Sequence, residues 1–326
     1  LDNPTNWFNE CLPTEIDAVT FSNTVASTYT TATPFSMASL LLVGDGDATF
    51  NLNGNTIQLD NFTQELPALF TLTNGTFRQR AMINFNFTVG SAALPGCRML
   101  VTGATVDGAQ TYTKYFRVHP SCDLVFTNKA ALSLVNAAYF YVYSNAVMNV
   151  VDSALTGAYP YPYAAAGSYL FRGLTANTGY FPTFTSASAS SSIAIIDCAV
   201  GDMWQQGKYF FIGTSNVATL SGGSRKEWDH QAYWGTGKDC TFNIRDGASL
   251  LVDSTFYCSV NSTGTNNVLH VHDGTLDFGR TTSVDTGTAK GITMRLSGTK
   301  PVVMCRVPLS AQYTYQFDVP ATTNEV

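Results

Sequence analysis

The densest group of residues able to do chemistry lies between Arg225 and Asp239. Two neighbouring carboxyl groups are what glycoside hydrolysis requires, one as acid and one as base or nucleophile, and an indole ring can stack on a sugar. The candidate catalytic residues are Glu227, Asp229 and His230. The candidate carbohydrate-binding residues are Trp228, Tyr233 and Trp234.

The same segment has two other interpretations. A polysaccharide lyase needs a cationic base beside a substrate carboxylate, and Arg225 or Lys226 could serve in that role. The interpretation without chemistry is a solvated loop whose tryptophans pack on the protein surface. We favour the loop, because adjacency in sequence does not create the geometry of a site.

A second group, His270-Val271-His272-Asp273, has the spacing of alternate residues on one strand. If Val271 points inward, both imidazoles share the outer face and could bind a divalent metal together with Asp273. Two ligands on one strand do not complete a metal site, so two exposed histidines are the favoured interpretation. The sequence predicts no cofactor, and it contains neither a Walker A motif nor a G-x-S-x-G elbow.

Glycosylation and disulfide formation are the modifications that the sequence raises. Asn-x-Ser/Thr sequons begin at Asn61, Asn74, Asn86 and Asn261, and coincidence is the favoured interpretation in a chain so rich in Asn and Thr. The 7 cysteines form no C-x-x-C pair, which favours structural roles. The spacings of Cys97/Cys122 and Cys240/Cys258 would suit neighbouring coils of a repetitive fold, although connectivity cannot be deduced from sequence.

Charge is scarce along the chain. Charged residues make up 12% of it and the formal net charge is −6, against about 25% charged residues in a typical soluble domain. The acidic balance argues against nucleic acid as a partner, because neutralising phosphates needs a clustered basic surface. No apolar run approaches the roughly 18 residues of a spanning helix. The first residue is not Met, which suggests a processed product or an excised fragment.

Short segments of period-2 alternation predict β-strands. Bulky residues alternate with Asn or Thr in segments such as Phe50–Asn53 and Phe85–Val89, which is the pattern of a half-buried strand. Gly and Asn or Asp separate these segments where a positive φ costs little, and helical periodicity is nearly absent. We expect turns at Asn53-Gly54, Asn74-Gly75, Asp107-Gly108, Asp246-Gly247 and Asp273-Gly274.

Repetition favours a parallel solenoid over an antiparallel β-sandwich or jelly roll. The turn and strand that begin at Asp246 are echoed 27 residues later at Asp273. A single coil cannot bury its inner face, so such a fold needs stacked neighbours and capped ends. The prediction is an all-β, single-stranded, right-handed parallel β-helix with an N-terminal cap.

The texture of Asp-Gly-Ala/Thr turns, outward Asn and Thr, and inward Val, Leu, Ile and Phe between Asp45 and Ser297 resembles two groups of right-handed parallel β-helix proteins. These are the pectin-lyase-like proteins and the passenger domains of bacterial autotransporters and adhesins. The resemblance implies either a long-lived surface shaft or a platform for polysaccharide cleavage. The Asp pair, His-Gly and Arg-x-Lys elements of pectinase-type hydrolases are not found, so their chemistry is not carried over.

We expect three parts along the chain. Residues 1–43 would cap the solenoid, residues 44–305 would form it with a long loop at about 158–192, and residues 306–326 would be a terminal strand or tail.

The leading functional hypothesis is a structural or adhesive protein on a cell or virion surface. Its Thr-, Asn- and Tyr-rich face would meet glycans or neighbouring copies of the chain, because a surface depleted in charge and rich in Tyr resembles an interface. The alternatives are a polysaccharide-degrading enzyme, either a lyase or a glycoside hydrolase, and a capsid-type β-sandwich protein.

Overall fold

The computed structural model describes residues 11–80, 84–108, 113–134, 138–156, 160–162, 166–177, 184, 189–198, 209–228, 232–252, 256–257, 264–278, 292–305 and 314–318. These residues form strands and no helix, so they contain no helical membrane span. They divide into two compact units. The first comprises Leu1–Pro160, Gly167–Tyr169 and Leu174–Thr178, and the second comprises Tyr161–Ala166, Leu170–Gly173 and Gly179–Val326.

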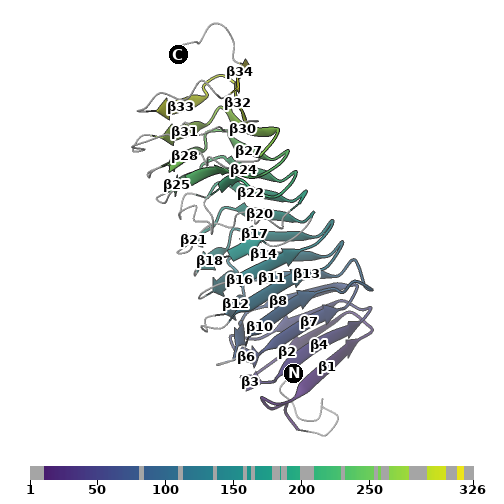
Figure 1. Cartoon of the computed structure of the whole chain (residues 1–326). Coiled ribbons are helices and arrows are strands. Elements are labelled where there is room, and N and C mark those ends of the chain that lie inside the picture. The colour runs from purple at the N-terminus through teal and green to yellow at the C-terminus, as the bar shows by residue number, and fades with distance from the viewer. Residues whose placement is uncertain are drawn as a thin grey trace. The chain divides into compact units, whose positions relative to one another are not determined.

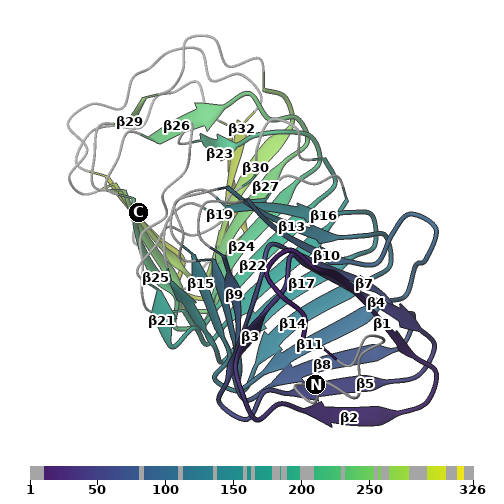
Figure 2. The ribbon, with the colours of Figure 1, turned by 90° about the horizontal axis from the view of Figure 1, so that it is seen from below.

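In the first unit each coil contributes one strand to each of three sheets, which form three sides of the coil (Figure 2). Sheet A contains β1 (Ala18–Asn23), β4 (Ser39–Gly44), β7 (Asn61–Glu65), β10 (Phe85–Val89), β13 (Lys114–Val118) and β16 (Ala138–Val142). Sheet B contains β2 (Ser27–Thr30), β5 (Ala48–Asn51), β8 (Leu69–Thr73), β11 (Arg98–Thr102), β14 (Asp123–Thr127) and β17 (Val147–Val151). Sheet C contains β3 (Phe35–Ser36), β6 (Thr56–Leu59), β9 (Thr76–Gln79), β12 (Thr105–Gly108), β15 (Ala131–Leu134), β18 (Ala154–Thr156) and β21 (Ala176–Asn177).

The second unit also has three series of strands. One contains β22 (Ser192–Ile196), β24 (Val217–Ser221), β27 (Thr241–Arg245), β30 (Asn267–His272), β32 (Ile292–Ser297) and β34 (Thr314–Asp318). The next contains β25 (Arg225–Trp228), β28 (Ser249–Val252), β31 (Thr275–Phe278) and β33 (Val302–Cys305), and the last contains β23 (Tyr209–Phe211), β26 (Ala232–Gly235) and β29 (Phe256–Tyr257). Strands β19 (Pro160–Pro162) and β20 (Ser168–Arg172) have residues in both units.

The pairing between described strands is parallel throughout, as the side-by-side arrows of β1, β4 and β7 illustrate (Figure 1). The structure therefore confirms the predicted all-β parallel solenoid and excludes the antiparallel sandwich. Coil strands β1 to β3 lie within residues 1–43, where the sequence suggests a cap, and the three-part division of the chain stays a prediction. Strand β34 pairs with β32, which makes it a terminal coil strand.

The interior of the first unit is built on phenylalanines that pack against one another from coil to coil. Phe62, Phe87, Phe116 and Phe140 come from successive strands of sheet A, and all four are fully buried. Their ring centroids are 4.6 Å apart for Phe62 and Phe87, 5.4 Å for Phe87 and Phe116, and 5.3 Å for Phe116 and Phe140. Such pairs contribute roughly 0.5–1.5 kcal/mol each beyond the burial of their area. The alternation in the sequence thus becomes a continuous aromatic column.

Left-handed backbone at the corners lets the coils turn. Asn53, Asp246 and Asp273 have φ of 49°, 56° and 51°, as expected of the turn residues. Gly44 has φ of 110°, and a Cβ there would lie 2.0 Å from the carbonyl oxygen of Asn23 on the preceding coil. Only glycine fits at this corner, because the neighbouring coil occupies the space of a side chain.

One predicted turn is wrong. Asp107-Gly108 lies within β12, and neither residue has a positive φ. Asp107 is nearly buried and accepts a hydrogen bond of 2.8 Å from Nε of Arg78 on the preceding coil. Because Arg78 pairs with the carboxylate, Asp107 can lie nearly buried in a strand, and the Asp-Gly pair continues β12 instead of forming a turn.

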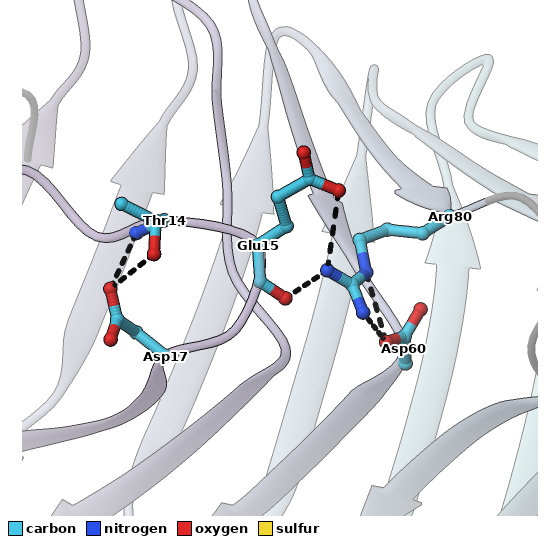
Figure 3. Close-up of polar contacts among 5 residues, drawn as sticks. All are labelled: Thr14, Glu15, Asp17, Asp60 and Arg80. Atoms are coloured by element: carbon cyan, nitrogen blue, oxygen red, sulfur yellow. Dashed lines mark hydrogen bonds and ion pairs between the residues drawn. The ribbon is translucent and has the colours of Figure 1, made fainter.

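An arginine joins the segment that precedes β1 to a later part of the first unit (Figure 3). Arg80 forms an ion pair with Asp60, to which its Nε donates at 2.9 Å, and it donates to the carbonyl of Glu15. The side chains of Arg80 and Asp60 are 14% and 4% exposed. Beside this contact, Asp17 accepts hydrogen bonds from the backbone N–H and the hydroxyl of Thr14, at 2.7 and 2.8 Å, which lower the pKa of its carboxyl.

Replacing Arg80 with Met should destabilise the protein by about 3 to 5 kcal/mol, because it leaves the Asp60 carboxylate buried without its partner. Urea unfolding followed by circular dichroism measures the change. Arg98→Met is the matched control, since Arg98 and Asp123 lie 3.7 Å apart with side chains 67% and 40% exposed. The control should lose less than about 1 kcal/mol. Equal losses in the two variants would contradict a special role for the buried pair.

Candidate functional site

The outer face of sheet A presents its side chains in straight rows. Phe116 and Val118 of β13 point into the core, so Tyr115 and Arg117 point outward. Parallel pairing in register then places residues of β7, β10, β13 and β16 side by side. One row is Asn61, Asn86, Tyr115 and Tyr139, and the next is Thr63, Thr88, Arg117 and Tyr141.

Four tyrosines form an ordered array at one end of these rows, which we call the tyrosine face: Tyr115, Tyr139, Tyr141 and Tyr143, each partly exposed. The rings of Tyr115 and Tyr139 stack with centroids 5.6 Å apart and planes 18° apart. Tyr141 and Tyr143 lie 6.5 Å apart with planes at 20°. The nearly parallel planes within each pair make an ordered aromatic cluster on the outer face of sheet A.

Arg117 lies within the tyrosine face. Its guanidinium carbon is 4.8 Å from the ring centroid of Tyr115 and 5.6 Å from that of Tyr141. Both distances are within the range of cation–π attraction. One guanidinium N–H donates to Oδ1 of Asn86 at 3.0 Å, and Nδ2 of Asn86 donates to Oδ1 of Asn61 at 2.8 Å. These contacts hold a positive charge and two amides beside the aromatic rings.

His119 extends the array beside Tyr143. The imidazole stacks on the phenol ring with centroids 5.3 Å apart and planes 24° apart. Burial and the nearby charge of Arg117 lower the pKa of His119, while Glu65 opposes them. The neutral imidazole is therefore favoured at this edge of the tyrosine face.

Flat aromatic rings bordered by hydrogen-bonding groups are suited to sugars. Phenol rings offer apolar contact area and a polar hydroxyl at low entropic cost, because a tyrosine has few rotatable bonds. Arg117 adds donors in a planar arrangement that matches a carboxylate. The outward residues described on β10, β13 and β16 include no carboxylate, so these strands do not present the carboxyl pair of a glycosidase.

The described candidates for catalysis and carbohydrate binding are distributed between two sheets. Glu227 and Trp228 lie in β25, which pairs with β28, whereas Tyr233 and Trp234 lie in β26, which pairs with β23 and β29. Asp229 and His230 lie outside the described residues. The catalytic and carbohydrate-binding roles of this segment stay predictions. Strand alternation places Lys226 in the interior, where it is 3% exposed.

The two histidines of β30 meet a common hydroxyl. Nε2 of His270 and Nδ1 of His272 lie 2.6 and 2.8 Å from Oγ of Ser297 on β32. Asp273 is engaged elsewhere, because its Oδ1 accepts a hydrogen bond of 2.6 Å from the backbone N–H of Lys300. Among the described residues, no group of three or more His, Cys, Asp or Glu is arranged to hold a metal ion.

Three sequons fall on described residues. Asn61 and Asn74 are exposed and Asn86 is partly exposed, whereas Asn261 lies outside the described residues. Asn61 and Asn86 are partners in the ladder between β7 and β10. Their glycosylation stays a prediction.

The tyrosine face was missed from the sequence, although a signal existed. Tyr139, Tyr141 and Tyr143 alternate with Phe140 and Val142, and Tyr115, Arg117 and His119 have the same period. Alternation with the aromatic residues outward is unusual for a solvated strand face. The sequence does not show that β13 and β16 pair with an offset of 24 residues, which places Tyr115 beside Tyr139.

Fold and site together define a parallel β-solenoid with an aromatic outer face. No family model and no curated protein matches the sequence. Among solved structures, the chain is similar to a hyper-glycosylated TibA fragment, with 10% identity, a TM-score of 0.23, and coverage of 93% of this chain and 96% of that one. A TM-score of this size carries no argument about function.

Lowering the pH should destabilise the edge of the tyrosine face. The fold lowers the pKa of His119 below 6.5, the value of an exposed histidine. The neutral imidazole therefore contributes to stability above pH 6.5, and this contribution is lost as the pH falls from 6.5 towards the pKa in the folded protein. His119→Gln should remove this dependence. Urea unfolding of both proteins at several pH values between neutral and mildly acidic measures the difference. A constant difference across this range would contradict the linkage.

Proposed function

We propose that the protein is a structural or adhesive surface protein that binds glycans through its tyrosine face. The observation that supports this function best is the stacked pair Tyr115 and Tyr139 with Arg117 fixed beside it. The rings supply an apolar platform, and Arg117 and Asn86 supply directional hydrogen bonds at its edge. Both kinds of group are needed to orient a sugar ring.

The coil register suits an extended ligand. The rows of sheet A repeat at the spacing of parallel strands, about 4.8 Å, so outward side chains recur at regular intervals along the direction of stacking. A polysaccharide chain could lie across several strands and make many weak contacts at once. Avidity of this kind needs no deep pocket.

The composition of the chain supports contacts with neighbouring copies, and the proposed location is outside the cell or on a virion. A chain with 12% charged residues and 16 tyrosines has the composition of an interface more than that of a freely soluble surface. A solenoid that uses local coil contacts could also serve as a long-lived support for the binding face. The proposed partners are therefore glycans and further copies of the chain.

Binding to a panel of neutral and uronate-containing oligosaccharides tests the proposal. In isothermal titration calorimetry the wild-type chain should bind at least one of them, and Tyr139→Ala and Tyr141→Ala should each weaken that binding roughly tenfold. Arg117→Met should weaken binding of the uronate sugars more than that of the neutral ones.

Thr71→Ala on the outer face of β8 is the control, and its affinity should be unchanged. Reducing ends are measured in the same samples. No binding across the panel, or binding that both tyrosine variants retain, would overturn the assignment of the tyrosine face. Cleavage abolished by Glu227→Gln would instead support the enzyme alternative.

A further inference from the structure

Two cysteines stand opposite each other on neighbouring coils of the first unit. Cys97 immediately precedes β11 and Cys122 immediately precedes β14, and these strands pair with Arg98 opposite Asp123. The backbone N–H of Asp123 donates to the carbonyl of Cys97 at 3.0 Å, which extends the ladder to the cysteines. Opposed residues of parallel strands have Cα atoms about 4.8 Å apart, within the roughly 4.4–6.8 Å that a disulfide spans.

The two side chains also point to the same place. Both cysteines are fully buried, and each thiol lies close enough to the other to shift its pKa. Each sulfur approaches the carbonyl oxygen of Leu94, at 3.6 Å for Cys97 and 3.9 Å for Cys122. A Cβ added at Gly90 would lie 2.4 Å from Sγ of Cys122, so the glycine provides the space that this sulfur occupies.

Other buried cysteines also direct their sulfurs to backbone carbonyls. Cys198 approaches the carbonyl of Ile196 at 3.2 Å and Cys240 that of Lys238 at 3.4 Å, as Cys122 approaches that of Pro120 at 3.6 Å. Cys97 and Cys122 in addition lie close enough for each thiol to shift the pKa of the other.

We propose that Cys97 and Cys122 are a disulfide-forming pair that links two successive coils at the corner that precedes sheet B. A thiolate of one cysteine attacks a small-molecule disulfide such as oxidised glutathione and releases one reduced glutathione. The second cysteine then attacks the mixed disulfide, forms the Cys97–Cys122 bond and releases the second glutathione. Two thiols are oxidised, one external disulfide is reduced, and two protons go to the released thiols or to solvent.

The contact shifts the pKa values of the two thiols in opposite directions. A hydrogen bond with Cys97 lowers the pKa of Cys122, whereas the hydrogen bond with Cys122 and burial raise the pKa of Cys97. A lowered pKa increases the thiolate fraction, and the thiolate is the nucleophile in exchange with a disulfide. Because both sulfurs are buried, the oxidant reaches them during folding or through local opening of the coil.

The link would restrain separation of the two coils. A bond that closes the loop between Cys97 and Cys122 reduces the entropy of the unfolded chain. In the folded chain it joins coils that β11 and β14 already hold in register. The oxidised protein should therefore melt at a temperature roughly 5 °C higher than the reduced one.

Peptide mapping of the whole chain equilibrated with oxidised glutathione tests the proposal. Trypsin cuts after Arg80, Arg98, Arg117 and Lys129, so the bond would join peptides 81–98 and 118–129, each of which contains a single cysteine. We expect this linked pair by mass spectrometry without reduction, its loss on reduction, and two fewer thiols that alkylate in denaturant.

Variants separate the pair from cysteine oxidation in general. Cys97→Ala and Cys122→Ala should each abolish the linked peptides and the rise in melting temperature. Cys198→Ala is the matched control and should retain both. Full alkylation of Cys97 and Cys122 after equilibration with oxidised glutathione, or glutathione adducts in place of the linked peptides, would overturn the proposal. These readouts do not depend on glycan binding.

Discussion

The structure depends on the in-register stacking of parallel coils. A strand such as β10 is hydrogen-bonded on both sides, by β7 and β13, and places Phe87 between Phe62 and Phe116. One coil by itself would leave its inner phenylalanines in water, so the stabilisation is cooperative between neighbours. Any change of register by one residue would turn these rings outward, because strand side chains alternate between the two faces.

The same register creates the candidate site. The constraint that packs Phe116 edge to face against Phe140 inside also stacks Tyr115 on Tyr139 outside, since the residues alternate on the same two strands. The aromatic surface is thus positioned by paired backbone rather than by a loop. A rigid array of this kind loses little conformational entropy when a ligand binds, which makes weak individual contacts effective.

The register also explains the other polar contacts between coils. Arg78 meets Asp107, and Arg117 meets Asn86, because each pair belongs to adjacent strands of one sheet. In the second unit Asn216 accepts from the backbone N–H of Ser191, and Asn267 does the same for Cys240 at the equivalent corner. Buried amides therefore satisfy corner backbone groups that no strand pairing reaches.

Much of the fold could be predicted from alternation and turn residues, which are local properties. Phe85, Phe87 and Val89 are buried as their spacing predicts, and Asp246 and Asp273 form stacked corners, with the N–H of Gly247 donating to the carbonyl of Asp273 at 2.7 Å.

The site could not be predicted in the same way. Coil length varies from 20 residues between Thr56 and Thr76 to 29 between Phe85 and Lys114, so the sequence does not state which residues become neighbours. Glu227 and Tyr233 are close in sequence but belong to different sheets, whereas Tyr115 and Tyr139 are distant and touch.

The measurement that tests the central claim most directly is the location of a bound sugar. In a chain with isotope-labelled Tyr and Trp rings, nuclear magnetic resonance can follow the aromatic signals during titration with an oligosaccharide that binds. The account predicts that the ring signals of Tyr115, Tyr139 and Tyr141 shift together and saturate with the affinity measured by calorimetry. The chemical shifts of Trp228 and Trp234 should not change. Shifts confined to the two tryptophans, with the tyrosine face unchanged, would contradict it.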